Sequence, residues 1–225
     1  MITLKELKND REVQQLIKVT EVELEVLGFT EHSNRHLSIV ANWAGELLRK
    51  LGATEHEIYL AEIAGYLHDI GNAVNRYDHS QSGAILAYMM LTRRGMDYGD
   101  AAEIMLAIGN HDEASGEPVS KVSAALILAD KSDVHKSRVR KNKVHNLATN
   151  DIHDRVNLAA ESSYLSVDTV ESGEKIITLN ITIDTKICSV MDYFEIYFNR
   201  MKLCKRAAAF LGCKFSLKIN NVELL

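Results

Sequence analysis

GYLHDIGNA (Gly65–Ala73) closes an apolar segment of the chain with a histidine and an aspartate side by side, His68 and Asp69. A helix with a buried pattern is an unfavourable place for these groups, because an ionised carboxylate away from water is costly unless it is paired or bound to a cation. One such pair carries little information by itself. It predicts a functional site only if other histidines and acids of the chain can meet it.

The sequence on both sides of this stretch predicts a largely helical region. Helices are expected near 13–17, from Ser33 to Gly52, from Thr54 to Ile70 with an end at Gly71, from Asp78 or His79 to Thr92, over 98–110, and from Ser120 to Asp133. In the second of these segments apolar residues recur every three or four positions, which is typical of a helix with one buried face. Ser33 and Gly52 are residue types that commonly cap a helix at its start and end.

The pattern changes after about residue 160. The segments SYLSVDTVE (163–171) and KIITLNITID (175–184) alternate between apolar and polar residues on the two sides of a Ser-Gly pair. Alternation with a period of two, interrupted by turn residues, predicts a β-hairpin. An amphipathic helix over 187–211 follows, and CKFSLKI (213–219) alternates again as a final strand.

These patterns predict a mainly α fold in two parts. The first part is a helical domain over residues 1–160. The second is a small α+β appendage over residues 161–225, in which a small antiparallel sheet of the hairpin and the final strand packs with one long helix. The appendage resembles no family that its sequence identifies.

Composition and charge are those of an ordinary globular chain. The formal net charge of −5 does not favour nucleic-acid binding. The N-terminal segment MITLKELKNDREVQQLIK has no apolar core for a signal peptide, and no run approaches the roughly 18 apolar residues of a membrane helix. A cytoplasmic protein is therefore expected. The three cysteines are odd in number and form no Cys-x-x-Cys pair, so they are expected to be reduced and structural: Cys188, Cys204 and Cys213.

Several histidines and aspartates fall on the inner faces of the predicted helices or at their inner ends. These residues are His36, His68, Asp69, His79, His111 and Asp130. A single inward histidine is more often a hydrogen-bonded core residue than a ligand, and a single aspartate at a helix end is usually a cap. Two aspartates with four histidines, however, would be costly to bury without a cation. Imidazoles and carboxylates are expected ligands of one or two divalent metals.

The order of these residues resembles the H…HD…D signature of the HD-domain metal-dependent phosphohydrolases. The segments RHLSIVANWAGELL (35–48), YLHDIGNA (66–73) and ALILADKSD (125–133) are similar to the successive motifs of that family. DHSQSGA (78–84) and GNHDE (109–113) are similar to the two extra histidine positions of its binuclear subgroup. The resemblance covers roughly residues 30 to 140 and implies an all-helical core with the metal at its centre.

Some assignments within this resemblance have alternatives. His32 lies one helical turn before His36 and could be the first ligand, but the apolar pattern that follows His36 fits that motif better. For His79 and His111, the alternatives to metal ligation are contact with substrate and exposure to solvent. Asp112 and Glu113 are expected to support the ligands or to face solvent.

The resemblance implies that Asp69 bridges two metals, with His36, His68 and Asp130 on one side and His79 and His111 on the other. Two metals about 3.5–4 Å apart can clamp a phosphoryl oxygen and activate a water molecule. The expected function is that of a metal-dependent phosphohydrolase, which cleaves a phosphoester of a small, nucleotide-like substrate through a metal-activated hydroxide. Mixed histidine and carboxylate ligation favours Fe or Mn, with Zn, Ni, Co or Mg as alternatives.

Basic residues follow Asp130 closely: Lys131, Lys136, Arg138, Arg140, Lys141 and Lys143. Lys131 adjoins a proposed ligand, and Arg138 lies about two turns further on if the helix continues. Nearby cations stabilise the negative charge that develops on phosphoryl oxygens, and an arginine can hold a phosphate with two hydrogen bonds. Asp69, Lys131 and Arg138 are therefore the candidate catalytic residues. For the two basic residues, the alternative is that they belong to a solvated face of the helix. That alternative is favoured for Arg140 and the two lysines after it.

Two rival functions remain open from the sequence. Some relatives of this fold use a di-iron pair for oxygen-dependent cleavage, and a metal-stabilised binding or signalling module would lack turnover. The presence of all the expected ligands argues against the second rival, while the C-terminal part, through which a homodimer could form, keeps it open. The chain has no Walker phosphate loop and no dinucleotide fingerprint, and none of its serines occupies a nucleophile elbow.

Overall fold

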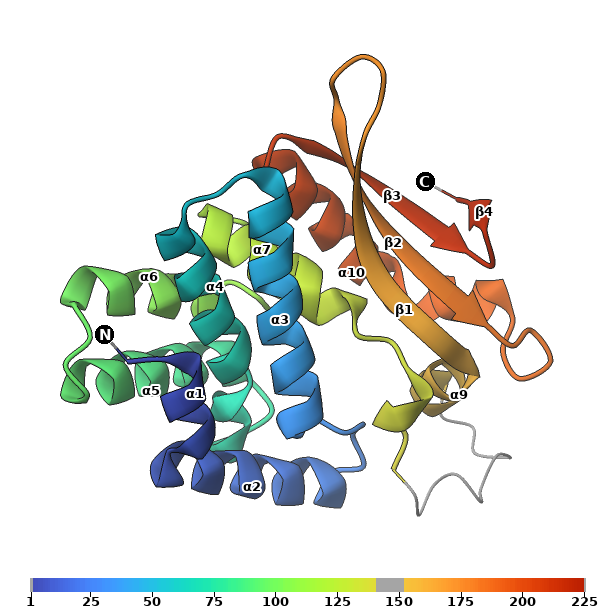
Figure 1. Cartoon of the computed structure of the whole chain (residues 1–225). Helices are drawn as coiled ribbons and strands as arrows, with labels where there is room; N and C mark the ends of the chain where they lie inside the picture. The colour runs from blue at the N-terminus through green and yellow to red at the C-terminus, as the bar shows by residue number, and fades with distance from the viewer. Residues whose placement is uncertain (1, 141–151, 225) are drawn as a thin grey trace.

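The computed structural model describes residues 2–140 and 152–224. Its elements are α1 (Leu4–Asn9), α2 (Arg11–Val26), α3 (Asn34–Leu51), α4 (Glu55–Leu67), the 3₁₀ helix η1 (Ile70–Ala73), α5 (His79–Arg93), α6 (Tyr98–Gly109), α7 (Lys121–Ser132), the 3₁₀ helix η2 (Lys136–Arg138), α9 (Ile152–Ala159), β1 (Ala160–Thr169), β2 (Lys175–Ile183), α10 (Val190–Phe210), β3 (Cys213–Ile219) and β4 (Val222–Glu223). The predicted mainly α fold with a small C-terminal α+β part is confirmed. Helices α1 to α7 gather on one side and the sheet lies on the other, with α10 packed against both α7 and β3 (Figure 1).

Helix α3 begins and ends at the predicted residues. The Ser33 side chain accepts a hydrogen bond from the backbone N–H of Arg35, which satisfies one of the free donors of the first turn. Gly52 follows the helix with a φ of 82°, a left-handed conformation that glycine adopts without steric cost. The buried face of α3 includes His36 and Val40, so the histidine is directed into the core as its spacing predicted.

Helix α4 ends at Leu67, three residues before the predicted end at Ile70. His68 and Asp69 lie in the turn that follows, and the chain continues as η1. The tight path has a steric cause: a Cβ atom on Gly71 would overlap the carbonyl oxygen of His79. Because glycine is the only residue without this atom, the turn can lie directly against the start of α5.

The sheet is mixed, so the predicted antiparallel sheet is wrong in part. The strand order is β1-β2-β3-β4. The β1–β2 hairpin is antiparallel as predicted, but β3 pairs with β2 in parallel, with Leu217 opposite Leu179. Helix α10 causes the difference, since it returns the chain to the end of the sheet where β2 began, as a helical crossover between parallel strands does.

The N-terminal segment forms two helices where one was expected near 13–17. Asp10 separates them. Its backbone N–H donates a hydrogen bond to the carbonyl oxygen of Leu7 at the end of α1, and its side chain accepts hydrogen bonds from the backbone N–H groups of Glu12 and Val13 at the start of α2. An aspartate in this position serves as an N-cap, which favours a new helix over continuation of the old one.

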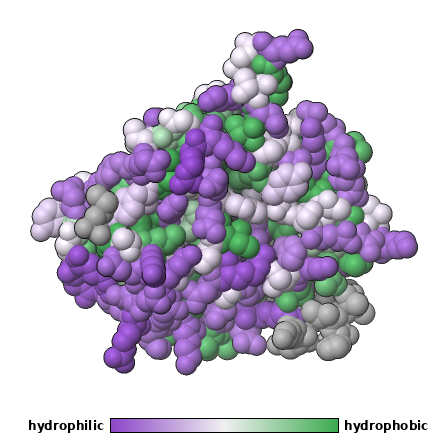
Figure 2. Space-filling view, viewed as in Figure 1, coloured by the Kyte–Doolittle hydropathy of each residue, from purple (hydrophilic) through white to green (hydrophobic). Residues whose placement is uncertain are grey.

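Apolar side chains are concentrated in a core that extends from the helices to the sheet. The face seen in Figure 2 is mostly hydrophilic, with smaller hydrophobic patches between the charged side chains. Within residues 2–140 and 152–224, no helix has both the length and the apolar composition that crossing a membrane requires. The first strand, β1, begins at Ala160, directly after α9. The division of the chain into domains over 1–160 and 161–225 stays a prediction.

Candidate metal centre

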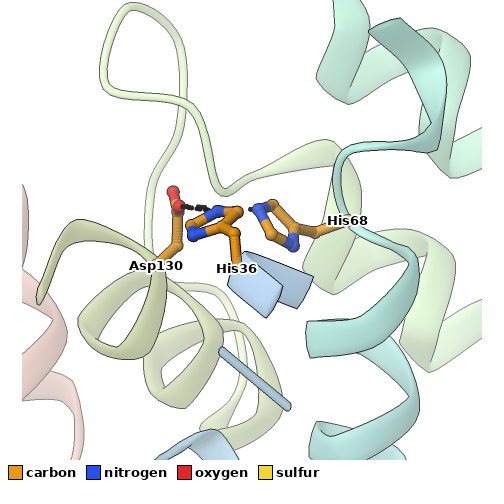
Figure 3. Close-up of side chains that lie close together, drawn as sticks. All are labelled: His36, His68 and Asp130. Carbon is orange, nitrogen blue, oxygen red and sulfur yellow. Dashed lines mark ion pairs between the residues drawn. The ribbon is translucent and has the colours of Figure 1, made fainter. Parts of the chain in front are cut away.

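Three helices bring His36, His68 and Asp130 together in the interior (Figure 3). His36 lies in the first turn of α3, His68 at the end of α4, and Asp130 in the last turn of α7. The Nε2 atoms of His36 and His68 lie 3.4 and 3.5 Å from Oδ1 of Asp130. These atoms are close enough together to bind one metal ion.

Asp69 lies between two pairs of histidines. Its Oδ2 atom is 3.6 Å from Nε2 of His36 and 3.2 Å from Nε2 of His68. Its Oδ1 atom is 3.5 Å from Nε2 of His79 and 4.0 Å from Nε2 of His111. The two oxygens of one carboxylate therefore face the two groups of ligands that the sequence resemblance implied, and all six predicted ligand residues converge.

Each of the four histidines is held in place by a hydrogen bond at Nδ1, the ring nitrogen that does not face the carboxylates. The Nδ1 atom of His36 donates a hydrogen bond to Oδ2 of Asp133 over 2.8 Å. The Nδ1 atoms of the other three bond backbone carbonyl groups, at 2.9 Å for His68, 3.1 Å for His79 and 2.6 Å for His111. Because these acceptors require a proton on Nδ1, the nitrogen left to bind a metal in each ring is Nε2, which points at the carboxylates.

The donor set fits a divalent metal. The Nε2 atoms of His36 and His68 are buried and have no hydrogen-bond partner within the part of the chain that the structure describes. A buried polar atom without a partner costs free energy, and metal ligation would satisfy it. Histidines fixed through Nδ1 by a carboxylate or carbonyl are the usual arrangement of imidazole ligands. Mixed imidazole and carboxylate donors suit Fe, Mn, Zn, Ni or Co.

The charges of the centre reinforce one another. Burial alone would raise the pKa of Asp130, but the charge of Lys131 and contacts with His36 and His68 hold it well below its usual range. Burial would likewise raise the pKa of Asp69, but the charge of His68 and a side-chain hydrogen bond with it hold this pKa well below its usual range. Both acids are therefore carboxylates at neutral pH, as metal ligation requires.

Metal binding is expected to release a proton. Burial lowers the pKa of His68, but the carboxylates of Asp69 and Asp130 outweigh burial and raise it to about 10 in the metal-free centre. Below that pH a metal must displace the proton on Nε2, so its apparent affinity should increase about tenfold per pH unit from 6 to 9. Calorimetry in buffers of different ionisation enthalpy measures the release, expected to be about one proton per metal at pH 7. An affinity independent of pH over this range would contradict the prediction.

Lys131 reaches the centre, as its sequence position suggested. Its Nζ atom lies 2.6 Å from Oδ2 of Asp130 and 2.7 Å from Oε2 of Glu113. The other oxygen of Glu113 accepts a hydrogen bond of 2.9 Å from Nε of Arg200, in α10. Glu113 thus supports the centre, as expected, by linking Lys131 to the C-terminal part of the chain.

Arg138 is not on a continuation of α7, because that helix ends at Ser132 and Arg138 lies in η2. Its guanidinium is buried nonetheless, and it donates hydrogen bonds to the backbone oxygens of Glu31 and Asp133. A third bond of 3.0 Å reaches Nε2 of His32. The helix does not continue to Arg138, yet Arg138 still lines the small cavity beside the centre.

The contacts of His32 favour His36 as the first ligand. The Nε2 lone pair of His32 accepts the bond from Arg138, while its Nδ1 donates to the carbonyl oxygen of Thr30. Burial and the charge of Arg138 hold the pKa of His32 well below its usual range, so this ring is neutral. Its ring nitrogens are thus both engaged, whereas Nε2 of His36 remains directed at Asp69 and Asp130.

The other basic residues after Asp130 lie away from the centre or are not among the residues that the structure describes. Arg140 donates to the carbonyl oxygens of Phe29 and Glu21, so it stabilises the chain locally and is not simply solvated. Lys136 is exposed. The predicted solvated positions Lys141 and Lys143 lie outside the described residues.

Residues not singled out from the sequence complete the site: Asp133, Arg200 and Arg76. Asp133 orients His36 and also pairs with Arg35 over 3.1 Å. Its position in the motif ALILADKSD was the only available signal. Arg200 could not be expected, because it lies in the appendage, 87 residues beyond Glu113. The Nη1 atom of Arg76 lies 3.4 Å from Nε2 of His79.

Asp133→Asn is expected to weaken metal binding about 10- to 100-fold, the usual effect of losing the carboxylate behind a ligating histidine. The amide cannot attract the Nδ1 proton of His36 as a carboxylate does, so His36 becomes a poorer ligand. Competition with a chelator measures the change. An affinity equal to that of the wild type would show that Asp133 does not orient this ligand.

The helical fold and the cluster of four histidines and two aspartates define the class, a helical protein with a candidate divalent-metal centre. The model of the HD domain matches residues 34–196, more than half of the chain. The protein belongs to the HD domain family.

Two further proteins are similar to this chain. An uncharacterised protein of Methanocaldococcus jannaschii is 28% identical over 158 residues, which are 60% of this chain and 60% of that protein. The chain therefore spans less than two thirds of the length of this relative. A crystal structure described as a predicted HD superfamily hydrolase from an uncultured Thermotogales bacterium has a TM-score of 0.44 and 21% identity, and it covers 69% of this chain and 89% of its own.

Proposed function

We propose that the protein is a metal-dependent phosphohydrolase that cleaves a phosphoester of a small, nucleotide-like substrate with a solvent-derived nucleophile. One observation carries the proposal: four imidazole Nε2 atoms and two carboxylates converge, and each imidazole is fixed through Nδ1. Such a cluster has no structural purpose that a hydrophobic core would not serve at lower cost. It is suited to one or two divalent metals, with Fe or Mn the first choice.

The six converging residues would hold the metal: His36, His68, Asp69, His79, His111 and Asp130. Bound divalent cations supply a Lewis acid that lowers the pKa of water and neutralises charge on phosphoryl oxygens. A cavity of about 20 Å³ lies against Asp69, His79 and His111. This volume is sufficient to hold one water molecule beside these residues.

The protein's own cations would hold the phosphoryl group. Lys131 and Arg138 both line the small cavity. Burial lowers the pKa of Lys131, but Asp130 and Glu113 raise it above its usual range, so its ammonium group persists at neutral pH. Fixed cations that face the position where negative charge develops stabilise the transition state. Lys131 is thus proposed to stabilise phosphoryl charge, and Arg138 to orient the group.

The test is metal analysis of the freshly purified protein, followed by a panel of phosphoesters with several metals. The panel includes mononucleotides, cyclic dinucleotides, guanosine tetraphosphate and dinucleoside polyphosphates. Phosphate release that a chelator abolishes and added metal restores supports the proposal, and it should persist under strict anaerobiosis. Release that requires oxygen would favour the di-iron oxygenase instead. Stoichiometric metal without turnover on any substrate would favour a binding module.

Association into a homodimer through the C-terminal part is a separate proposal. Strand β1 lies at one edge of the sheet that the described residues form, and its Tyr164 side chain is about half exposed. An edge strand presents backbone groups that can pair with another chain. Light scattering of the purified protein measures the mass directly, and a monomer would exclude this association.

A further inference from the structure

A second, larger cavity adjoins the candidate metal centre. Its volume is about 310 Å³, at the lower end of the range for cavities that bind small organic molecules. It shares several lining residues with the small cavity over the centre: His32, Arg76, Glu113, Arg138 and Arg200. A ligand with one phosphate at the centre could therefore extend into this space, which we name the arginine cavity.

The charges of the arginine cavity favour an anion. Arg76, Arg138 and Arg200 line it with three guanidinium groups. Its two carboxylates are Asp154 and Glu113, and Glu113 pairs with both Arg200 and Lys131, of which Lys131 lies outside this cavity. The lining thus has one more cation than it has anions. A cavity that keeps an excess of cations close to buried walls concentrates anionic ligands. A neutral substrate portion would leave this excess of positive charge without a counter-ion.

Arg200 is the arginine best placed to bind a ligand. Its Nε atom donates to Glu113, and its guanidinium lies over the ring of Tyr197 with 4.6 Å between Cζ and the ring centroid. These two contacts fix the plane of the group. Neither Nη1 nor Nη2 makes a hydrogen bond to the described residues 2–140 and 152–224. Two parallel N–H donors held in this way match the oxygens of a phosphate.

The walls between these charges are partly apolar. Tyr197, Phe29 and Leu27 line the arginine cavity, and Arg76 lies 5.3 Å from the ring centroid of Phe29. The cavity therefore offers an aromatic and aliphatic surface for the body of a ligand beside its guanidinium groups. The arrangement suits a molecule whose two anionic groups are separated by a ring.

We propose that the arginine cavity binds the part of the substrate distal to the scissile phosphate, and that Arg200 binds a second phosphate group there. The proposal rests on the proposed function in placing the scissile phosphate at the metal centre. It makes α10 of the C-terminal part a specificity element of the site. Substrates with two separated phosphates are then preferred over those with one.

Binding to the metal-free chain of 225 residues tests this directly, because it requires no turnover. Calorimetric titration compares adenosine 3′,5′-bisphosphate with adenosine 5′-monophosphate. The bisphosphate should bind the wild type at least about tenfold more tightly, the effect expected of added charge-assisted hydrogen bonds. In Arg200→Gln the ratio of the two affinities should fall to about one. Arg200→Lys keeps a charge for Glu113 but loses the planar donors, so its ratio should be intermediate.

The matched control is Arg206→Gln, which removes an exposed arginine of the same helix that pairs with Glu117. Its ratio should equal that of the wild type. Equal affinities of the two nucleotides in the wild type, or an unchanged ratio in both Arg200 variants, would overturn the proposal. If the ratio behaves as expected but the metal-loaded protein hydrolyses no phosphoester, the second phosphate site stands and only the proposed function fails.

Discussion

Asp69→Ala is expected to remove metal and activity together. Both oxygens of this carboxylate are involved: Oδ2 faces His36 and His68, and Oδ1 faces His79 and His111. Losing a group behind a ligand typically costs about 10- to 100-fold in affinity or activity, so losing a ligand shared by both halves should cost more than about 100-fold. Metal analysis and phosphoester turnover measure the two effects on the same sample.

A matched control is Asp100→Ala, which removes a carboxylate that pairs with His56 away from the centre. It should keep the metal content and turnover of the wild type. Thermal unfolding of both variants in a chelator separates the loss of a ligand from the loss of the fold. Without bound metal, the unfolding temperature of each variant depends only on the stability of the protein itself. Full metal content together with full turnover in Asp69→Ala would refute the assignment of the centre.

The local parts of the fold were predictable because their signals are local. The caps Ser33 and Gly52 act within one turn of the helix that they delimit, and the observed α3 begins and ends beside them. The pairing of β3 was not predictable, because alternation along a strand shows which face is buried but not which neighbour it pairs with. The parallel direction follows from α10, whose packing on α7 depends on the whole core.

The same distinction applies to the site. The candidate ligands could be found because each occupies the inner face or inner end of a helix, where a charged or polar residue is unexpected. Arg200 and Asp133 could not be assigned a role, since their partners Glu113 and His36 lie 87 and 97 residues away. An arginine on an amphipathic helix has the same pattern whether it faces solvent or a cavity.

Lys131→Met is expected to lower kcat by about 100-fold or more while the metal content stays within about twofold of the wild type. The side chain is buried, and its Nζ atom lies beside Asp130 in the lining of the small cavity. Methionine retains the apolar stem and removes only the charge. Losing one donor that stabilises transition-state charge typically costs about 10²- to 10³-fold in kcat. Steady-state kinetics at saturating metal give kcat and KM separately.

Two variants distinguish catalysis from support. Lys131→Arg keeps a positive charge between Asp130 and Glu113 and should recover part of the lost kcat. The matched control Lys121→Met removes an exposed lysine of the same helix and should leave kcat and metal content unchanged. If Lys131 only holds Asp130 in place, Lys131→Met will instead weaken metal binding, and kcat will return to the wild-type value once metal saturates the centre. A normal kcat at saturating metal would therefore assign Lys131 to ligand support, because an interaction made in the transition state cannot be replaced by more metal.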